Sequence, residues 1–379
     1  MKPIVIIGSG LAGYGLLREL KNRQCPSPRL LITADGGESY YKPNLSSSLA
    51  KKKSASDLVM SQATTMAQEM NAEILTHTRV VAVDATQHKL FLNNGQERVY
   101  SQLVLAVGSN PIRLPLTGDG AGEVLSVNNL DDYALFQKKL VHAQRIAIIG
   151  PGLIGSEFAN DLILSGRQVT IIGPDPWPIS TLVPQIAGLA VQQAMADKGA
   201  IWHLETLNGP IEKTPSGYAT TLKNGVTVAA DVILSAVGIR AETQLASQSG
   251  LKTNRGIVTD AFLQTSSPNI FALGDCAEVD GRSLPFVQPL MIGTRALAAT
   301  LMGQPQKVQY PPMPVQIKTT LHPVITLPPQ TKEGRWIFEG TPTAGISGKF
   351  LTGDDKLAGF VLTGGRIAEK TTLMEALAP

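Results

Sequence analysis

Six residues near the N-terminus have the types and spacing needed to hold a phosphate group. They form the glycine-rich turn Gly8-Ser9-Gly10-Leu11-Ala12-Gly13. Gly8 suits a tight turn, Gly10 lets a pyrophosphate approach the backbone, and Gly13 lets a helix pack closely on a strand. The free N–H groups and positive dipole end at a helix start would then bind the phosphate oxygens. The pattern predicts a site for an adenine dinucleotide.

The flanking residues supply the elements that this turn requires. The apolar run Pro3 to Ile7 predicts a buried parallel strand, and Leu11 to Leu20 has the periodicity of a helix. A second strand, Arg29 to Thr33, ends at Ala34-Asp35, about where this fold places an acid that binds a ribose. Asp35 is therefore the candidate ribose ligand, and the alternative is a turn aspartate before Gly36-Gly37.

The same order of elements occurs a second time along the chain. The strand Arg145 to Ile149 leads into Gly150-Pro151-Gly152-Leu153-Ile154-Gly155, which begins 142 positions after Gly8. Alternating apolar residues predict an antiparallel meander in each copy, and the copies close at Gly108 and Gly238, 130 positions apart. The chain therefore contains an internal repeat of a whole domain. Its predicted fold class is α/β, with two Rossmann-like dinucleotide-binding domains of the three-layer ββα type.

The region after the second copy has no third glycine turn. A strand, Ile270 to Leu273, instead delivers Gly274-Asp275 at its carboxyl end, where ligands of an open parallel sheet bind. We therefore expect residues 1–113 and 238–313 to form one dinucleotide-binding domain, interleaved with a second over 114–237.

A small α+β domain is expected over residues 314–379. The predicted strands are Val315–Lys318, Trp336–Glu339 and Phe360–Leu362, before a short terminal helix. The proline-rich spans 311–314 and 323–329 are interpreted as hinges. In the first domain, a further helix is expected near Asp57 to Met70.

Composition excludes several classes of protein. The net charge of +3 is too small and dispersed for a nucleic-acid binder. Two cysteines, Cys25 and Cys276, cannot form a disulfide framework or a thiolate metal site, so a reducing compartment, the cytoplasm, is expected. The five histidines show no ligand spacing, so no metal is predicted. No stretch is long and apolar enough to span a bilayer.

In combination, the two glycine turns and the segment from Thr265 to Asp275 resemble the FAD-dependent pyridine-nucleotide oxidoreductases of the glutathione reductase fold. The resemblance covers nearly the whole chain. It implies FAD at the first turn, NAD(P)H at the second, and Asp275 as a ligand of the flavin ribityl chain. Shorter motifs resemble the bacterial NAD-dependent rubredoxin reductases. These motifs are Ile32-Thr-Ala-Asp35, Tyr41-Lys-Pro-Asn-Leu-Ser46, Gly152 to Asn160, Gly274-Asp-Cys-Ala-Glu278 and Met313 to Lys318.

The resemblance also assigns residues that spacing alone does not. Lys42 is expected near the flavin N5 as a catalytic residue, with Glu157 holding it charged and Pro43 packed on the ring. The alternatives are an exposed lysine on a turn and a helix-surface acid. Further implied cofactor-binding residues are the Val80 backbone, Gly238, Gly274, Val287 and Lys318. The disulfide reductases of this fold carry a CxxxxC motif after the second strand, but Tyr40 to Ser48 contains no cysteine, so electrons must pass to an external acceptor.

The second glycine turn has a departure that bears on cofactor choice. Where NADH enzymes place an acid after the second strand, this chain has Gly173, and Asp175 follows. No lysine or arginine occurs from Gly173 to Pro184, so a 2′-phosphate lacks a partner and NADH is favoured over NADPH. Asp175 is either a ribose ligand or a turn aspartate between two prolines.

The leading functional hypothesis is a reductase that oxidises NADH by hydride transfer to FAD and passes electrons singly to rubredoxin or a similar small acidic iron protein. Its pathway would be alkane hydroxylation or an oxygen-stress electron chain. The alternatives are a reductase of a ferredoxin or flavorubredoxin, and a flavin-binding NADH sensor without catalysis. The basic run Lys51-Lys52-Lys53 could guide an acidic acceptor or could be a solvated charge run. Because the third segment is short, a monomer is expected.

Overall fold

The computed structural model describes residues 1–377 and divides the chain into two compact units. Unit 1 consists of Met1–Lys42, Ser56–Asn110 and Ile239–Pro311. Unit 2 consists of Pro43–Ala55, Pro111–Gly238 and the chain from Pro312 onward. Each unit is thus assembled from three separate stretches of sequence. Among residues 1–377, no helix is both long and apolar enough to cross a membrane.

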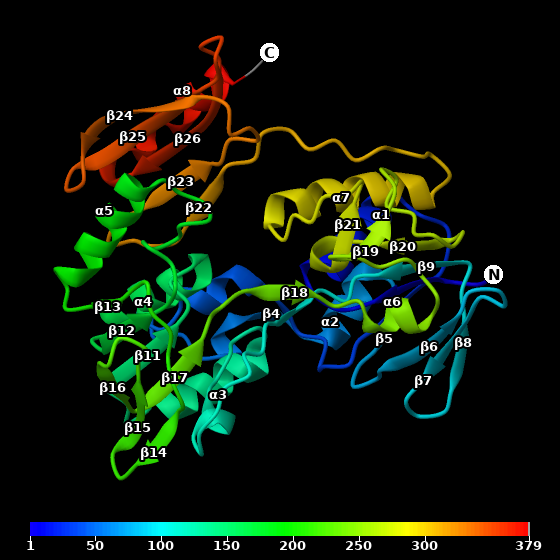
Figure 1. The fold of residues 1–379 in the computed structure, drawn as a ribbon. Helices are drawn as coiled ribbons and strands as arrows, with labels where there is room; N and C mark the ends of the chain where they lie inside the picture. Colours follow the sequence, from blue (N-terminus) through cyan, green and yellow to red (C-terminus); the bar gives the residue numbers. More distant parts are fainter. Residues whose placement is uncertain (378–379) are drawn as a thin grey trace. The chain divides into compact units, whose positions relative to one another are not determined.

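Unit 1 is built on a parallel sheet with the strand order β20-β9-β1-β2-β5. The central strand β1 pairs in parallel with β2 and β9, and its four residues are all buried. Helix α1 follows β1 directly and packs against helix α7 (Figure 1). The bounds are β1 Ile4–Ile7, α1 Leu11–Asn22, β2 Arg29–Ile32, β5 Glu73–Leu75, β9 Gln102–Leu105, β20 Ile270–Ala272 and α7 Val287–Leu301. An antiparallel meander joins β5 to β9 through β6 Val80–Asp84, β7 Lys89–Leu92 and β8 Glu97–Val99.

Unit 2 repeats this plan. Its parallel sheet has the order β13-β12-β11-β17, and Leu125 extends it by a parallel bridge to Leu234. The bounds are α3 Leu130–Leu140, β11 Arg145–Ile149, α4 Leu153–Leu164, β12 Gln168–Ile172, α5 Gln185–Ala196, β13 Ile201–His203 and β17 Val232–Ser235. The meander is β14 Glu212–Thr214, β15 Gly217–Thr221 and β16 Thr227–Ala230. The predicted α/β fold with two repeated dinucleotide-binding modules is confirmed.

Shorter elements complete both units. The pairs are β3 Ser39–Tyr40 with β4 Val59–Ser61, β10 Ser109–Pro111 with β18 Ile239–Ala241, and β19 Ile257–Thr259 with β21 Ala277–Val279. The other helices are α2 Ala63–Met70, α6 Gln244–Gln248 and five 3-10 turns: η1 Lys42–Ser46, η2 Ser56–Leu58, η3 Ala121–Glu123, η4 Gly274–Cys276 and η5 Gly364–Glu369. The helix predicted from Asp57 is wrong over its first residues because Val59 pairs with Tyr40 in a strand; the helix begins at Ala63.

The last part of unit 2 is an antiparallel sheet with the order β22-β23-β26-β25-β24, followed by helix α8. The bounds are β22 Val315–Ile317, β23 Val324–Leu327, β24 Arg335–Thr341, β25 Gly345–Leu351, β26 Leu357–Thr363 and α8 Lys370–Ala376. The interpretation of residues 323–329 as a hinge is wrong, because the prolines only flank β23, whose four residues are buried and paired on both sides.

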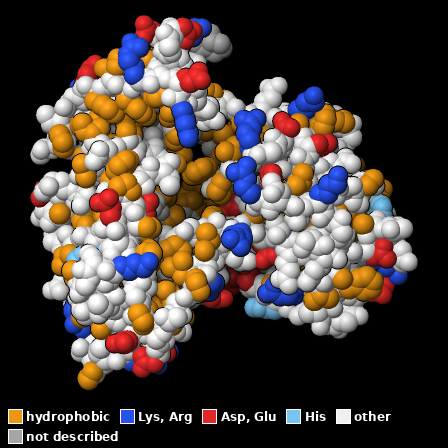
Figure 2. Space-filling view, viewed as in Figure 1, with side chains coloured by type: hydrophobic (Ala, Val, Ile, Leu, Met, Phe, Trp, Pro, Cys, Tyr) orange, Lys and Arg blue, Asp and Glu red, His pale blue; other side chains and the backbone are white. Residues whose placement is uncertain are grey.

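The edge strand of this sheet leaves apolar side chains in contact with solvent. Ile337 and Phe338 on β24 are 41% and 37% exposed, and Trp336 stacks on Phe338. Figure 2 shows apolar side chains exposed over the part of unit 2 that holds these strands. The predicted strand Trp336–Glu339 therefore exists, within a longer β24 at the sheet edge.

Candidate functional site

The first glycine turn is held in a conformation that only glycine fits. Gly8 has φ +113, and a Cβ there would lie 2.3 Å from the Ala106 carbonyl oxygen. A Cβ on Gly13 would lie 1.9 Å from the Gly8 carbonyl oxygen. A Cβ on Gly10 would have no neighbour within 4 Å. Gly8 and Gly13 thus make the turn, while Gly10 keeps the space above it clear.

The start of α1 leaves donors available at this turn. Its first backbone bond runs from the Tyr14 N–H to the Gly10 carbonyl, 3.1 Å away, and the N–H groups of residues 11–13 precede it. Gly10 is the N-cap and supplies no capping side chain. The predicted residues Leu11 and Ala12 therefore present backbone donors to an anion, as a dinucleotide phosphate requires.

Beside the turn, two side-chain hydroxyl groups and one backbone N–H donate to a single carboxylate oxygen. The Asp35 Oδ1 accepts from the Ser9 Oγ at 2.9 Å and from the Thr33 Oγ1 at 2.5 Å. It also accepts from the Gly37 N–H at 3.0 Å, as a turn aspartate does. Ala34 and Asp35 are exposed. Asp35 therefore makes the contact of a turn aspartate, and its role as a ribose ligand stays a prediction. Thr33 was not among the predicted site residues.

The predicted aspartate from the last strand lies next to α1. Gly274 has φ +81, and a Cβ there would come within 3.0 Å of the Ala12 Cβ. Asp275 follows in η4 and accepts from the Ser109 Oγ at 3.1 Å. Sequence reasoning missed Ser109, which is 166 positions away. Val80 begins the meander strand β6, and Val287 begins α7. All these residues belong to unit 1.

Cys276 is shielded from solvent. Its side chain is fully buried and its Sγ lies 3.3 Å from the Leu105 carbonyl oxygen. Burial raises the pKa of the thiol to about 11. Cys25 is also buried and neither cysteine is in a disulfide. A thiolate at Cys276 is therefore disfavoured at neutral pH.

The second glycine turn reproduces the geometry of the first. Gly150 has φ +110, and a Cβ on Gly155 would lie 1.9 Å from the Gly150 carbonyl oxygen. Gly152 is the N-cap of α4, and a Cβ there would meet nothing within 4 Å. The helix then begins with Leu153 and Ile154, and its first bond joins the Ser156 N–H to the Gly152 carbonyl. Gly238, the predicted closing glycine, has φ +112.

The absence of an acid at position 173 has a steric cause. A Cβ on Gly173 would lie 2.2 Å from the Pro151 Cδ, so the proline ring occupies the space of a side chain. Asp175, two residues on, is half-buried and accepts from the Ser180 Oγ at 2.6 Å. The Thr206 and Glu205 N–H groups bind the carbonyls of Gly173 and Asp175. Asp175 is thus a fixed acid at the end of β12, and its role as a ribose ligand stays a prediction.

A buried ion pair occupies another part of unit 2. Glu157 on α4 is 1% exposed, and its Oε2 lies 2.7 Å from the Lys318 Nζ. The Ser46 Oγ donates to the same oxygen at 2.5 Å, and the Lys318 N–H donates to the Oε1 at 2.9 Å. Lys318 Nζ also donates to the Pro43 carbonyl. The interpretation of Glu157 as a helix-surface acid is therefore wrong. Ser46 was missed because 111 residues separate it from Glu157.

Lys42 lies at the boundary of the units. It is the last residue of that stretch of unit 1, half-buried at the start of η1. Its predicted pairing with Glu157 stays a prediction. The following stretch, residues 43–55, is anchored within unit 2 by Asp161, which accepts from the N–H groups of Leu49 and Ala50 at 2.7 and 3.1 Å. Burial raises the pKa of Asp161. This anchor leads directly into Lys51-Lys52-Lys53, all exposed.

Taken together, the fold and the two glycine turns define a two-dinucleotide α/β oxidoreductase. Residues 2–306 match the sequence profile of the family described as pyridine nucleotide-disulphide oxidoreductase. Residues 307–377 match a profile described as rubredoxin binding C-terminal domain. The chain belongs to the pyridine nucleotide-disulphide oxidoreductase family, and its cofactors are FAD and NAD(H).

Full-length relatives agree with this placement. The chain is 41% identical to a rubredoxin-NAD(+) reductase of Acinetobacter baylyi, over 100% of this chain and 98% of the relative. It is 35% identical to a nitric oxide reductase FlRd-NAD(+) reductase of Aliivibrio fischeri, over 99% and 98%. The solved covalent putidaredoxin reductase-putidaredoxin complex matches with a TM-score of 0.90 at 22% identity, over 99% of this chain and 93% of that one. NADH:rubredoxin oxidoreductase from Clostridium acetobutylicum matches with a TM-score of 0.81 at 20% identity, over 99% and 94%. These two structures support the fold.

Proposed function

We propose that this chain oxidises NADH and passes the electrons one at a time to rubredoxin. The observation that carries the proposal is the joint presence of two dinucleotide turns and, at residues 307–377, a match to a rubredoxin-binding domain. Relatives at 41% identity over the full length are named rubredoxin-NAD(+) reductases. Because both cysteines are buried and neither is in a disulfide, an internal disulfide relay is not part of the proposal.

The residues of unit 1 fit FAD. Gly8 to Gly13 and the start of α1 would hold its pyrophosphate, Asp35 the adenosine ribose, and Gly274 and Asp275 the ribityl chain. The Val80 backbone would meet the adenine, with Val287 beside the ring. Pro43, which the resemblance assigns to the ring, belongs to unit 2. The open space at Gly10 and the donors of residues 11–13 support this fit. When bound, FAD accepts a hydride and releases single electrons.

The residues of unit 2 fit NADH in the same way. Gly150 to Gly155 and the start of α4 would hold its pyrophosphate, Asp175 the adenosine ribose, and Gly238 would line the nicotinamide side. Asp175 repels a 2′-phosphate, and no basic residue follows in the loop up to Pro184, so NADH is preferred over NADPH.

Two lysines have distinct proposed roles. Lys42 supplies a positive charge where negative charge develops on reduction, and Glu157 holds that charge in place. Lys318 neutralises the buried Glu157 and fixes its orientation together with Ser46. An unpaired carboxylate at this depth would be strongly disfavoured, which makes Lys318 and Ser46 positioning residues.

The domain assignment follows from these sites. We propose FAD-binding residues 1–113 and 238–313, NAD-binding residues 114–237 and an acceptor-binding domain at 314–379. The acceptor is an acidic iron protein attracted by basic residues that include Lys51-Lys52-Lys53. A cytoplasmic monomer is part of the same proposal, with an electron chain for alkane hydroxylation or oxygen stress as its setting.

The names of several relatives favour flavorubredoxin as a second acceptor of the electrons. Relatives at 34–36% identity over nearly the whole chain are named nitric oxide reductase FlRd-NAD(+) reductases. Ferredoxin reduction and a non-catalytic NADH sensor are the remaining alternatives.

An anaerobic stopped-flow experiment tests the proposal. NADH should bleach the flavin absorbance of the purified protein, and oxidised rubredoxin should then restore it within the turnover time. Flavorubredoxin and a ferredoxin, tested in parallel, rank the acceptors by the rate of restoration. Rapid bleaching followed by slow restoration with every iron protein would instead favour the sensor.

A further inference from the structure

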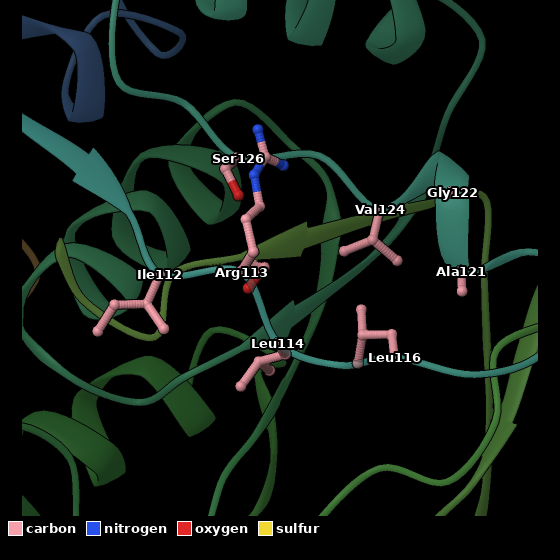
Figure 3. Close-up of a pocket in the computed structure, with 9 residues that line it drawn as sticks. Ile112, Arg113, Leu114, Leu116, Ala121, Gly122, Val124 and Ser126 are labelled. Carbon is pink, nitrogen blue, oxygen red and sulfur yellow. The ribbon is translucent and has the colours of Figure 1, made fainter. Parts of the chain in front are cut away.

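Unit 2 contains a cavity that none of the proposed cofactor sites uses. It has a volume of about 270 Å³ and is lined only by residues of unit 2 (Figure 3). Two of its lining residues, Ser126 and Ser235, lie at the carboxyl end of the sheet, where Leu125 pairs with Leu234 in parallel. Ligands of open parallel sheets bind at this end.

The internal repeat shows that the two serines replace core residues. In unit 1, Leu105 pairs with Ala272 three positions before the closing Gly108, and both side chains are fully buried. In unit 2, the residue three positions before the closing Gly238 is Ser235, and Ser126 follows Leu125 next to it. Where unit 1 has an apolar contact, unit 2 has two hydroxyl groups and a cavity.

One polar group of the cavity lacks a partner among the described residues. The Ser235 Oγ is buried and has no hydrogen-bond partner among residues 1–377. Arg113 is exposed, lines the same cavity and extends toward Ser126 in Figure 3. Because buried hydroxyl groups are normally satisfied, the Ser235 Oγ is available for a hydrogen bond to a ligand in this cavity.

The cavity is on the opposite face of the sheet from the second glycine turn. A Cβ on Gly155 in α4 would lie 3.5 Å from the Ala236 Cβ, which places Ala236 on the α4 face. Successive strand residues point to opposite faces, so Ser235 faces away from α4. Ile233, two residues earlier, packs in the apolar cluster of the meander with Val228 and Ala230. The proposed NADH site and this cavity are therefore distinct.

We propose that this cavity binds a small carboxylate with an apolar body. Arg113 pairs with the carboxylate, and the Ser235 and Ser126 hydroxyls hydrogen-bond to it. Leu114, Leu116 and Val124 form the apolar wall that receives the hydrocarbon part. No acidic residue lines the cavity, so nothing there repels an anion. Its volume lies just below the roughly 300 Å³ at which pockets for larger organic ligands begin, which restricts the ligand to a short chain or a single ring.

Calorimetry on the intact protein with its FAD bound tests the proposal, with butanoate, hexanoate and benzoate as probes. At least one carboxylate should bind saturably at millimolar concentration, while hexan-1-ol and hexylamine should bind more weakly. Arg113→Gln should weaken binding about tenfold or more, because a charge-assisted hydrogen bond is lost. Ser235→Leu, which restores the unit 1 residue, should abolish it. Lys138→Gln, an exposed charge change on α3, is the matched control and should leave binding unchanged.

The location of the site is tested by saturating the protein with NAD+. Carboxylate binding should persist, because the two ligands contact opposite faces of the sheet. Displacement of the carboxylate by NAD+ would overturn the proposal, as would the absence of saturable binding by all three carboxylates. Equal affinity for parent, Arg113→Gln and Ser235→Leu would also overturn it. Since Arg113 is exposed, its variant keeps the test valid even if Ser235→Leu fails to fold.

Discussion

The two glycine turns have nearly the same backbone and different surroundings. Gly10 and Gly152 cap their helices with φ −69 and −72, and both turns place a would-be Cβ 1.9 Å from a carbonyl oxygen. The first turn is backed by an acid, Asp35, bonded to Ser9 within the turn. In the second turn, Pro151 takes the position of Ser9. Its ring fills the space that a side chain at position 173 would need. The shared backbone suits the pyrophosphate that both dinucleotides contain. The differing residues, Ser9 with Asp35 and Pro151 with Gly173, lie where the two ribose sites are expected.

The largest expected effect separates the two turns. Gly10→Val should abolish FAD retention, because the branched side chain fills the space that a pyrophosphate needs. Gly152→Val should retain FAD and weaken NADH binding about 100-fold, since steric overpacking costs up to about 3 kcal/mol. Flavin absorbance and NADH titration measure the two effects.

The control for this pair is Gly353→Val. Gly353 also has no atom within 4 Å of a would-be Cβ and lies outside both turns, so this variant should keep FAD and NADH binding. Exchanged phenotypes, with Gly152→Val colourless and Gly10→Val yellow, would reverse the assignment of the turns.

The second-largest effect concerns the positive charge of Lys42 in unit 1. Lys42→Ala should slow flavin reduction by NADH about 10- to 100-fold, as expected when an interaction with a charged group is lost, with less effect on FAD binding. Stopped-flow absorbance measures the rate. Lys198→Ala, an exposed lysine in unit 2, is the control. An unchanged reduction rate in Lys42→Ala would remove this lysine from the catalytic site.

Pro151 leaves no room for an acid at position 173, so Asp175 is expected to set the preference for NADH over NADPH. Asp175→Ser should reduce the preference for NADH over NADPH about tenfold, because a charged hydrogen-bond acceptor is lost and its repulsion of a 2′-phosphate disappears. Gly173→Asp, which places an acid where NADH enzymes carry one, should not compensate, since its Cβ would lie 2.2 Å from the Pro151 Cδ. Dissociation constants for NAD+ and NADP+ measure both effects. An unchanged ratio in Asp175→Ser would make Asp175 a turn residue only.

The smallest expected effect concerns the acceptor. Reversing Lys51, Lys52 and Lys53 to glutamate should slow rubredoxin association about fivefold at low ionic strength, and the difference should vanish at high salt. Flavin reduction by NADH should stay as in the parent. Reoxidation rates against salt concentration provide the measurement, and equal rates at low salt would exclude steering by this cluster.

Sequence was sufficient for features with a local steric cause. The glycine turns are determined by the geometry of a strand, turn and helix, so their spacing identifies them. Spacing also predicts Asp35 and Asp275, whose roles as ligands stay predictions. Ser46, Ser109 and Ser180 were missed because serine has no distinctive pattern. Ser46 and Ser109 also meet their carboxylates only through the fold, across 111 and 166 positions. The buried strand β23 was missed because its flanking prolines dominated the composition of a short segment.

The central proposal is that the first glycine turn binds FAD and the second binds NADH. A crystal structure of the yellow protein with NAD+ bound tests it most directly. We expect the FAD pyrophosphate at the start of α1, against Gly10, and the NAD+ pyrophosphate at the start of α4, against Gly152. Asp175 should contact the adenosine ribose of NAD+. Electron density for FAD at α4, or for NAD+ at α1, would contradict the account.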